Sequence, residues 1–262
     1  MKQLWLRAKL AWEYFSHPDT DTSPDIELVF KLIANLDKQD NKSYIKDFNK
    51  LSVADKIYQA KLPVRLLVKE NNYPKDSFGL ALKNFMYNGE DIIDLFQVSL
   101  VPYRATRKKN TRFNKFTEAT LLQHDMIHLL NGYDTSAFGE SNVLAFSLAH
   151  EWRKSLATIL FSSFFVTLRN TFMPSKYLKG KTFLDTIKFI PVWVFMRCII
   201  EAYLRGKKAK WFLTIDWESY LYTPLEDVKK ELNMSSKPHY WNKVFFNWKA
   251  VEVHYKQLKK EK

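Results

Sequence analysis

Four side chains in the middle of the sequence have the types and the spacing of a metal site: His124, Asp125, His128 and Glu140. His124 and His128 are four residues apart, so on a helix they share one face and their ring nitrogens can meet at one point. Asp125 adds an oxygen ligand, and Glu140 can return on the next helix because Gly132 is typical of a helix end. Imidazole and carboxylate groups are ligands of zinc and other divalent first-row metals. The pattern predicts a divalent metal site, with zinc as the expected ion; the alternative is a pair of helix histidines with no ion between them.

Two consecutive helices must position these ligands, and we expect them over residues 114–131 and 135–169. In the second helix Glu140 and Glu151 lie in line, because eleven residues make about three turns. Three turns also rise by about 16 Å, so Glu151 cannot bind the same ion. Glu151 or its neighbour His150 could instead hold a ligand in its orientation.

The composition favours an all-α fold. The chain contains only six glycines, and stretches of alternating apolar and polar residues are scarce. Its 262 residues fit a single compact helical domain with the metal site between two central helices. Further helices are expected over residues 25–37, 52–60, 76–86, 223–233 and 238–260, and Thr223-Pro224-Leu225-Glu226 is typical of a capping box.

The His124-Asp125-x-x-His128 motif, followed after eleven residues by Glu140, resembles the metal motif of the ubiquinone (coenzyme Q) biosynthesis protein 4 family. Upstream, residues 73–81 resemble the family's Pro-x-x-Thr/Ser-Leu-Gly-x-Ala segment, and downstream, residues 205–229 resemble its C-terminal signature. The resemblance divides a single domain over residues 1–262 into three parts. These are a family-like core at about 70–235, an N-terminal helical extension over 1–69 and a C-terminal helix over 238–260.

The resemblance implies a largely helical, homodimeric protein that binds zinc or a similar ion. It further implies oxidative decarboxylation at C1 of a polyprenylated hydroxybenzoate-type acid, or organisation of the other quinone-pathway enzymes at the membrane, or both. His124, Asp125, His128 and Glu140 are the ligands in this interpretation. Whether the protein is an enzyme stays open at this point. No mitochondrial presequence is evident, so a bacterial relative is expected.

Two alternatives to a catalytic metal site follow from the same residues. A shell of four protein ligands would close a structural zinc site, which suits a non-catalytic prenyl-lipid-binding or scaffold protein. A metal-dependent hydrolase is the other alternative, by analogy with His-Glu-x-x-His sites, although Asp125 is shorter than the glutamate used there. No nucleic-acid-binding motif is found, and a nucleic-acid partner is not expected.

The charge of the chain is +13 and is clustered. A cluster without acidic residues precedes the first metal helix, and such a cluster attracts anionic groups. An anionic membrane surface and a carboxylate substrate are the expected partners, and a solvated surface is the alternative. The candidates for the anionic group are Arg104, Arg107, Lys108 and Arg112.

The most apolar segments are residues 156–168 and 189–196, and both are too short to span a bilayer. They would ordinarily belong to the core, but their aromatic rings could also wall a tunnel for an isoprenoid lipid. The candidates for such a tunnel are Phe161, Phe164, Phe165, Trp193 and Phe195.

We expect a cytoplasmic protein that lies peripherally on the inner face of the membrane. Charged residues interrupt the apolar stripe of residues 1–15, so no signal peptide is predicted, and no transmembrane helix is predicted elsewhere. That stripe could lie in a membrane interface or dock on the core. Cys198 is the only cysteine, so no intrachain disulfide can form and a buried core position is expected.

Overall fold

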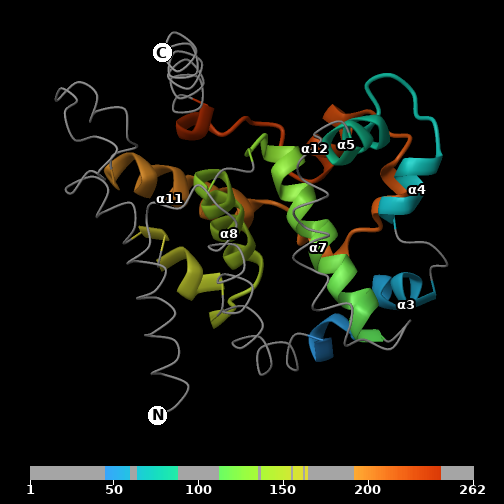
Figure 1. Ribbon diagram of the computed structural model, residues 1–262, viewed down its shortest axis with the longest axis horizontal. Helices are drawn as coiled ribbons and strands as arrows, with labels where there is room; N and C mark the ends of the chain where they lie inside the picture. Colours follow the sequence, from blue (N-terminus) through green and yellow to red (C-terminus); the bar gives the residue numbers. More distant parts are fainter. Residues whose placement is uncertain are drawn as a thin grey trace, which may run out of the picture.

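A computed structural model describes residues 45–59, 64–87, 112–134, 137–154, 156–161, 163–164 and 192–242. The helices labelled in Figure 1 are α3 (Ser52–Gln59), α4 (Val64–Glu70), α5 (Phe78–Tyr87), α7 (Arg112–Asn131), α8 (Ala137–His150), α11 (Val192–Lys208) and α12 (Leu225–Glu231). Two short 3-10 helices, η2 (Phe212–Thr214) and η3 (Trp217–Tyr220), lie between α11 and α12 in the chain. Within these residues the only β-type pairing is one isolated bridge between Ser77 and Pro224. The predicted all-α fold is confirmed.

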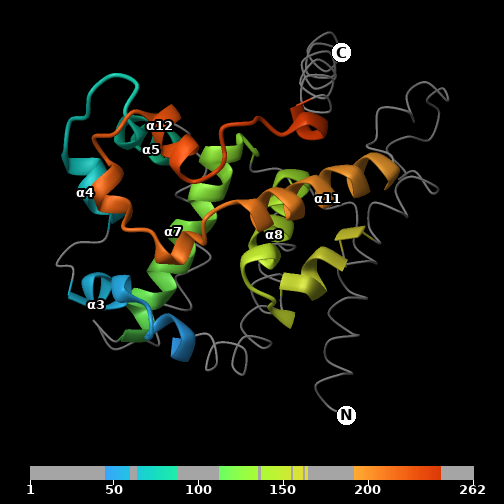
Figure 2. The same ribbon diagram turned by 180° about the vertical axis from the view of Figure 1, so that it is seen from behind.

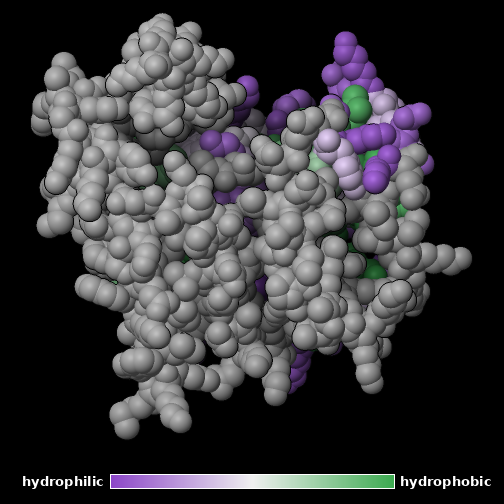
Figure 3. All heavy atoms as spheres, viewed as in Figure 1, coloured by the Kyte–Doolittle hydropathy of each residue, from purple (hydrophilic) through white to green (hydrophobic). Residues whose placement is uncertain are grey.

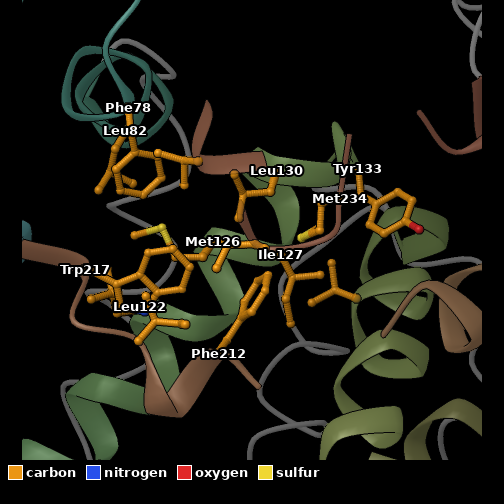
Figure 4. Packing of buried hydrophobic residues seen from close by; sticks show 14 of the residues in the cluster. Phe78, Leu82, Leu122, Met126, Ile127, Leu130, Tyr133, Phe212, Trp217 and Met234 are labelled. Carbon is orange, nitrogen blue, oxygen red and sulfur yellow. The ribbon is translucent and has the colours of Figure 1, made fainter. Parts of the chain in front are cut away.

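Helix α7 runs through the middle of the molecule. In both views α3, α4, α5 and α12 lie on one side of it, and α8 and α11 lie on the other (Figures 1 and 2). The core gathers around α7, where Met126 and Ile127 are fully buried. Complete burial of side chains of this size stabilises a fold by about 1.5–3 kcal/mol each. The neighbours drawn around them are Phe78 and Leu82 of α5, Leu122 and Leu130 of α7, Phe212, Trp217, Tyr133 and Met234 (Figure 4).

Helices α8 and α11 pack against each other and run parallel. Phe138 near the start of α8 meets Phe195 near the start of α11, with 5.7 Å between ring centroids. At the other end Gly206 of α11 approaches α8 so closely that an added Cβ would lie 2.6 Å from the Phe146 carbonyl oxygen and 2.8 Å from the Ala149 Cβ. A glycine is therefore needed at this crossing, because any side chain would push the helices apart.

Two segments far apart in the sequence interlock beside α7. The backbone N–H of Gly79 donates to the Leu221 carbonyl and that of Phe78 to the Thr223 carbonyl, both at 2.8 Å. The N–H of Leu225 in turn donates to the Asp76 carbonyl at 2.9 Å. These contacts join the upstream and the downstream segments that carry the family resemblance.

The predicted helix after residue 223 is confirmed, but the predicted capping box is not formed. Pro224 occupies the N-cap position of α12, and no side chain caps this end. The backbone of residues 221–225 instead pairs with residues 76–79, and this long-range pairing fixes how the chain enters the helix.

The predicted helix over residues 135–169 is wrong in its length, because α8 ends at His150 and residues 151–153 are not helical. Directly after this helix end, the Glu151 carboxylate accepts a hydrogen bond from the Trp211 indole at 2.9 Å, which is a contact that local periodicity does not predict. Residues 239–242 form the start of the helix predicted over 238–260, and the rest of that helix and the predicted helix over 25–37 lie outside the described residues.

Among the helices of the described part, none combines the length and the apolar character that a bilayer-spanning segment requires. Cys198 is buried, as expected.

Ser77 caps the N-terminus of α5. Its hydroxyl donates to the Pro74 carbonyl at 2.7 Å and accepts from the backbone N–H of Leu80 at 3.2 Å. The Ser77→Ala variant should therefore lose about 1 kcal/mol of unfolding free energy, because a backbone donor in the first turn loses its partner. Urea denaturation measures this loss. Ser235→Ala, at an exposed position, is the control and should change stability by less than about 0.5 kcal/mol; equal losses in both variants would contradict the capping role.

Candidate metal centre

Helix α7 carries His124 and His128, and the first turn of α8 carries Glu140. The two imidazoles face each other, with 3.1 Å between their Nε2 atoms. The Glu140 carboxylate lies against both rings: Oε2 is 3.1 Å from Nε2 of His124 and Oε1 is 3.2 Å from Nε2 of His128. Two nitrogens and a carboxylate therefore converge on one point, and this group could hold a metal ion.

The turn between the two helices fixes the ring of His128. Gly132 adopts a left-handed conformation with φ of 69°, and the N–H groups of Gly132 and Tyr133 both donate to the His128 carbonyl, at 2.8 and 3.2 Å. This helix end combines the hydrogen bond of the αL motif, made by Gly132, with the longer-range hydrogen bond of the Schellman motif, made by Tyr133. It places the Tyr133 carbonyl 3.1 Å from Nδ1 of His128. A carbonyl only accepts hydrogen bonds, so Nδ1 donates to it, and Nε2 is the ring atom that faces the site.

The spacing of these atoms fits one small cation. Atoms bound about 2.0–2.1 Å from one ion lie about 2.9 Å apart at an octahedral angle and about 3.4 Å apart at a tetrahedral angle. The observed separations of 3.1 and 3.2 Å fall between these two values. The donor set suits zinc and other divalent first-row ions, because imidazole and carboxylate are among their common ligands.

The site lies at the edge of the core. His128 is 2% exposed, whereas His124 and Glu140 are 21% and 33% exposed, so the group has access from one side. Burial acts to raise the pKa of Glu140, but the imidazole of His124 and hydrogen bonds from both histidines outweigh it and lower that pKa well below its ordinary value. Glu140 is therefore an anion at neutral pH, which is the form that binds metals.

Asp125 stands apart from this group. It is buried, but its carboxylate is not among the ligand atoms that meet at the site. Consecutive residues on a helix point about 100° apart, and here the Asp125 carboxylate does not reach the atoms of His124, His128 and Glu140 that meet at the site. The structure therefore brings three of the four predicted ligands together.

Three further groups support the site, and the sequence interpretation missed them. The Tyr133 carbonyl holds His128, and the Trp241 indole donates to the Gly132 carbonyl at 2.9 Å, which secures the same turn. The ring of Phe85 in α5 stacks on the His128 ring with 6.1 Å between centroids. Gly132 was the one available signal, because a glycine at a helix end predicts a turn that delivers backbone groups back to the last turn.

The other predicted site residues are placed only in part. Phe195 is 3% exposed and packs on Phe138, whereas Phe161 and Trp193 are 63% and 58% exposed at the surface. Phe164 is half-buried. Arg112 begins α7, and its side chain is not described; the other positions lie outside the described residues, namely Arg104, Arg107, Lys108 and Phe165. The lipid tunnel and the anion site stay predictions.

His150 and Glu151 do not contact the metal centre, because they lie at the opposite end of α8 from Glu140. The Glu151 carboxylate accepts from the Trp211 indole and pairs with Arg153 at 3.3 Å. His150 packs between the rings of Phe146 and Phe212. The predicted role of this pair in orienting a ligand does not follow from these contacts.

The buried Glu151 carboxyl predicts a pH-dependent stability. Burial raises the pKa of Glu151 to about 7, although Arg153 and the Trp211 N–H act to lower it. The folded chain favours the protonated form, so Glu151 adds its full contribution to the free energy of unfolding below about pH 4.5. This contribution is lost as the pH rises through about 7. Burial lowers the pKa of His150 to about 4. The contribution of His150 to the free energy of unfolding therefore has the opposite pH dependence and is lost as the pH falls through about 4.

The Glu151→Gln variant isolates the first effect, because glutamine can still accept from Trp211. The difference in unfolding free energy between this variant and the parent chain should shift by about 2 kcal/mol in favour of the variant as the pH rises from about 5 to about 8. Urea denaturation at each pH measures this shift. Glu226→Gln, at an exposed position, should show a constant difference over the same range. A constant difference for Glu151→Gln as well would contradict the raised pKa.

No family model matches the chain, and no curated protein matches it in a sequence comparison. The fold, however, is similar to a crystal structure from Nostoc punctiforme that is described as a "Putative ubiquinone biosynthesis protein". The two chains are 15% identical with a TM-score of 0.51, and the match covers 88% of this chain and 97% of the other. At this identity the likeness shows a common fold, in a protein whose description points to ubiquinone biosynthesis.

Proposed function

We propose that this chain binds one divalent metal ion, zinc in our assignment, through His124, His128 and Glu140. We further propose that it acts on a polyprenylated hydroxybenzoate-type acid in ubiquinone biosynthesis, by oxidative decarboxylation at C1. In this reaction the bond between C1 and the carboxylate carbon breaks and carbon dioxide leaves. Water supplies the oxygen of the new C1 hydroxyl group, and an external two-electron oxidant takes up the two electrons. The observation that carries the proposal is the convergence of the two Nε2 atoms and the Glu140 carboxylate, with Nδ1 of His128 held by a carbonyl. The fold likeness and the sequence motif support the pathway.

The number of ligands favours a site that takes a substrate. Structural zinc sites have four protein ligands, whereas catalytic ones have three and leave a position for water or substrate. Among the described residues three candidate ligands meet, and Asp125 is not one of them. An ion held there would bind and polarise the carboxylate of a substrate acid. This arrangement supports the catalytic alternative over the closed structural site.

The chain's own residues would prepare the site for an acid. The two imidazoles keep Glu140 ionised, so its carboxylate can bind a metal ion without first losing a proton. The hydrogen bond from His128 to the Tyr133 carbonyl keeps the ring fixed before any ligand arrives. The partial exposure of His124 and Glu140 leaves one side open for the carboxylate.

Two measurements test the proposal. Native mass spectrometry of protein purified from its own host should show one divalent metal per chain. The metal-loaded protein should then bind a prenylated 4-hydroxybenzoate about ten-fold or more tightly than the methyl ester of the same compound, because only the acid offers a carboxylate. Glu140→Gln should remove this preference. Equal binding of acid and ester would overturn the substrate assignment.

The chemistry is tested separately from binding. Release of carbon dioxide from the acid by the metal-loaded protein supports the decarboxylase. Tight binding of the acid without release, under oxidising conditions and with metal bound, would identify the chain as a non-catalytic lipid-binding protein of the same pathway.

A further inference from the structure

The outward face of α11 carries a continuous row of large apolar side chains. Trp193, Met196, Ile200 and Leu204 follow each other at intervals of three or four residues, so they form one stripe along the helix. Their exposed fractions are 58, 37, 51 and 54%, respectively. Scattered apolar residues on a surface need no explanation, but a stripe of four on one helix face marks an interaction surface.

The same face is positively charged. Its cations, all exposed, are Arg197, Lys207 and Lys208. Glu201 is the only acidic residue of α11, and it is engaged elsewhere: its carboxylate accepts from the backbone N–H groups of His239 and Tyr240, at 2.6 and 2.9 Å. The apolar stripe is therefore flanked by three positive charges with no exposed anion on the helix.

Tyr240 extends this face next to Arg197, and two further aromatic side chains are exposed on the same side of α7. Arg197 lies 5.8 Å from the centre of the Tyr240 ring, and that ring is 39% exposed. Trp152 and Phe161, on the segment that follows α8, are 73% and 63% exposed. Both ribbon views draw this segment on the same side of α7 as α11 (Figures 1 and 2).

We propose that this face of α11 docks on an anionic lipid surface. A helix that lies in a membrane interface buries Trp, Leu and Ile among the acyl chains and places Lys and Arg at the headgroups, which is the pattern of this face. Charge decides between the candidate occupants. A second copy of the chain would bring the three cations of this face against three more, whereas an anionic bilayer neutralises them.

This surface is independent of the proposed chemistry, because α11 contains none of the three candidate metal ligands. Its test therefore uses the protein without added metal. Vesicles of phosphatidylcholine alone are compared with vesicles that contain about 30% phosphatidylglycerol, and bound protein is measured by co-sedimentation. We expect the protein to bind the anionic vesicles at least about ten-fold more tightly than the neutral ones.

Two variants and a matched control locate the surface. Lys207→Glu with Lys208→Glu should weaken binding to the anionic vesicles by about thirty-fold or more, at about 1 kcal/mol for each lysine removed. Ile200→Ser with Leu204→Ser should weaken it by about ten-fold or more, through lost apolar burial. The control is Lys75→Glu with Lys230→Glu, which makes the same charge change at exposed positions before α5 and in α12. Hydrophilic residues gather at that edge of the molecule, across α7 from α11 (Figures 1 and 3).

The outcomes are distinct. Selective loss in the two α11 variants, with the control unchanged, supports the proposal. Equal loss in the control shows a diffuse charge effect and overturns it. A parent dimer that becomes monomeric in Ile200→Ser with Leu204→Ser, with vesicle binding unchanged, assigns the face to a second copy instead. Unchanged vesicle binding and unchanged mass in that variant would mean that a segment of this chain or another protein covers the face, which also overturns the proposal.

Discussion

The His128→Ala variant is expected to lose its metal, with an affinity more than about 100-fold below that of the parent chain. Replacing groups that merely orient a metal ligand already costs 10- to 100-fold in affinity, so removing a ligand should cost more. His128 is the most constrained member of the group, because its ring is buried and its second nitrogen is hydrogen-bonded to Tyr133. Elemental analysis after dialysis, and competition with a chromophoric chelator, measure the loss.

A second pair of variants separates ligation from folding, since His128→Ala also leaves a cavity in the core. Glu140→Gln keeps the size of the side chain and removes its charge, and it should lose metal as well. Asp125→Asn makes the same change one residue from His124 and should retain the metal, because its carboxylate lies outside the group. Full metal content in His128→Ala would refute the site. Equal loss in Asp125→Asn and Glu140→Gln would restore the four-ligand prediction.

The parts of the site that follow from local geometry could be predicted from the sequence. His124 and His128 share a helix face because of their spacing, and Gly132 ends that helix because glycine tolerates the left-handed conformation observed there. The prediction of Asp125 as a ligand rests on its residue type and its position in the family motif. Adjacent side chains on a helix diverge by about 100°, and in the structure the Asp125 carboxylate lies outside the group.

The parts that depend on distant segments could not be predicted from periodicity. The helix predicted over residues 135–169 contains no glycine after Gly139 and no proline, yet α8 ends at His150, where Glu151 binds the Trp211 indole from a segment sixty residues away. Likewise, Thr223 has the sequence context of a cap, but the backbone pairing with residues 76–79 takes precedence. A search for side-chain ligands cannot find the backbone carbonyl of Tyr133, although this carbonyl holds the His128 ring in place.

Gly139→Ala is expected to destabilise the fold by about 3 kcal/mol and to weaken metal binding with it. A Cβ at this position would lie 2.0 Å from the carbonyl oxygen of Asp134 and 2.4 Å from its Oδ1. A backbone carbonyl cannot turn aside as a flexible side chain can, so the start of α8 must move. Glu140 is the next residue, and its carboxylate moves away from the two imidazoles when the helix does. Urea denaturation and the chelator competition give the two effects.

Gly132→Ala is the matched comparison, because it adds the same methyl group at the other glycine of the connection. There a Cβ meets nothing within 4 Å, and the cost comes only from the left-handed φ of 69°. We expect a loss of about 1 kcal/mol, which Gly132→Asn should reduce because asparagine tolerates this conformation. At Gly139 asparagine should be worse than alanine, since the obstacle is steric. Denaturation of the metal-free proteins removes the stabilisation that bound metal would add. Equal losses at the two glycines would show that the close approach of Asp134 to Gly139 does not hold the start of α8 in place.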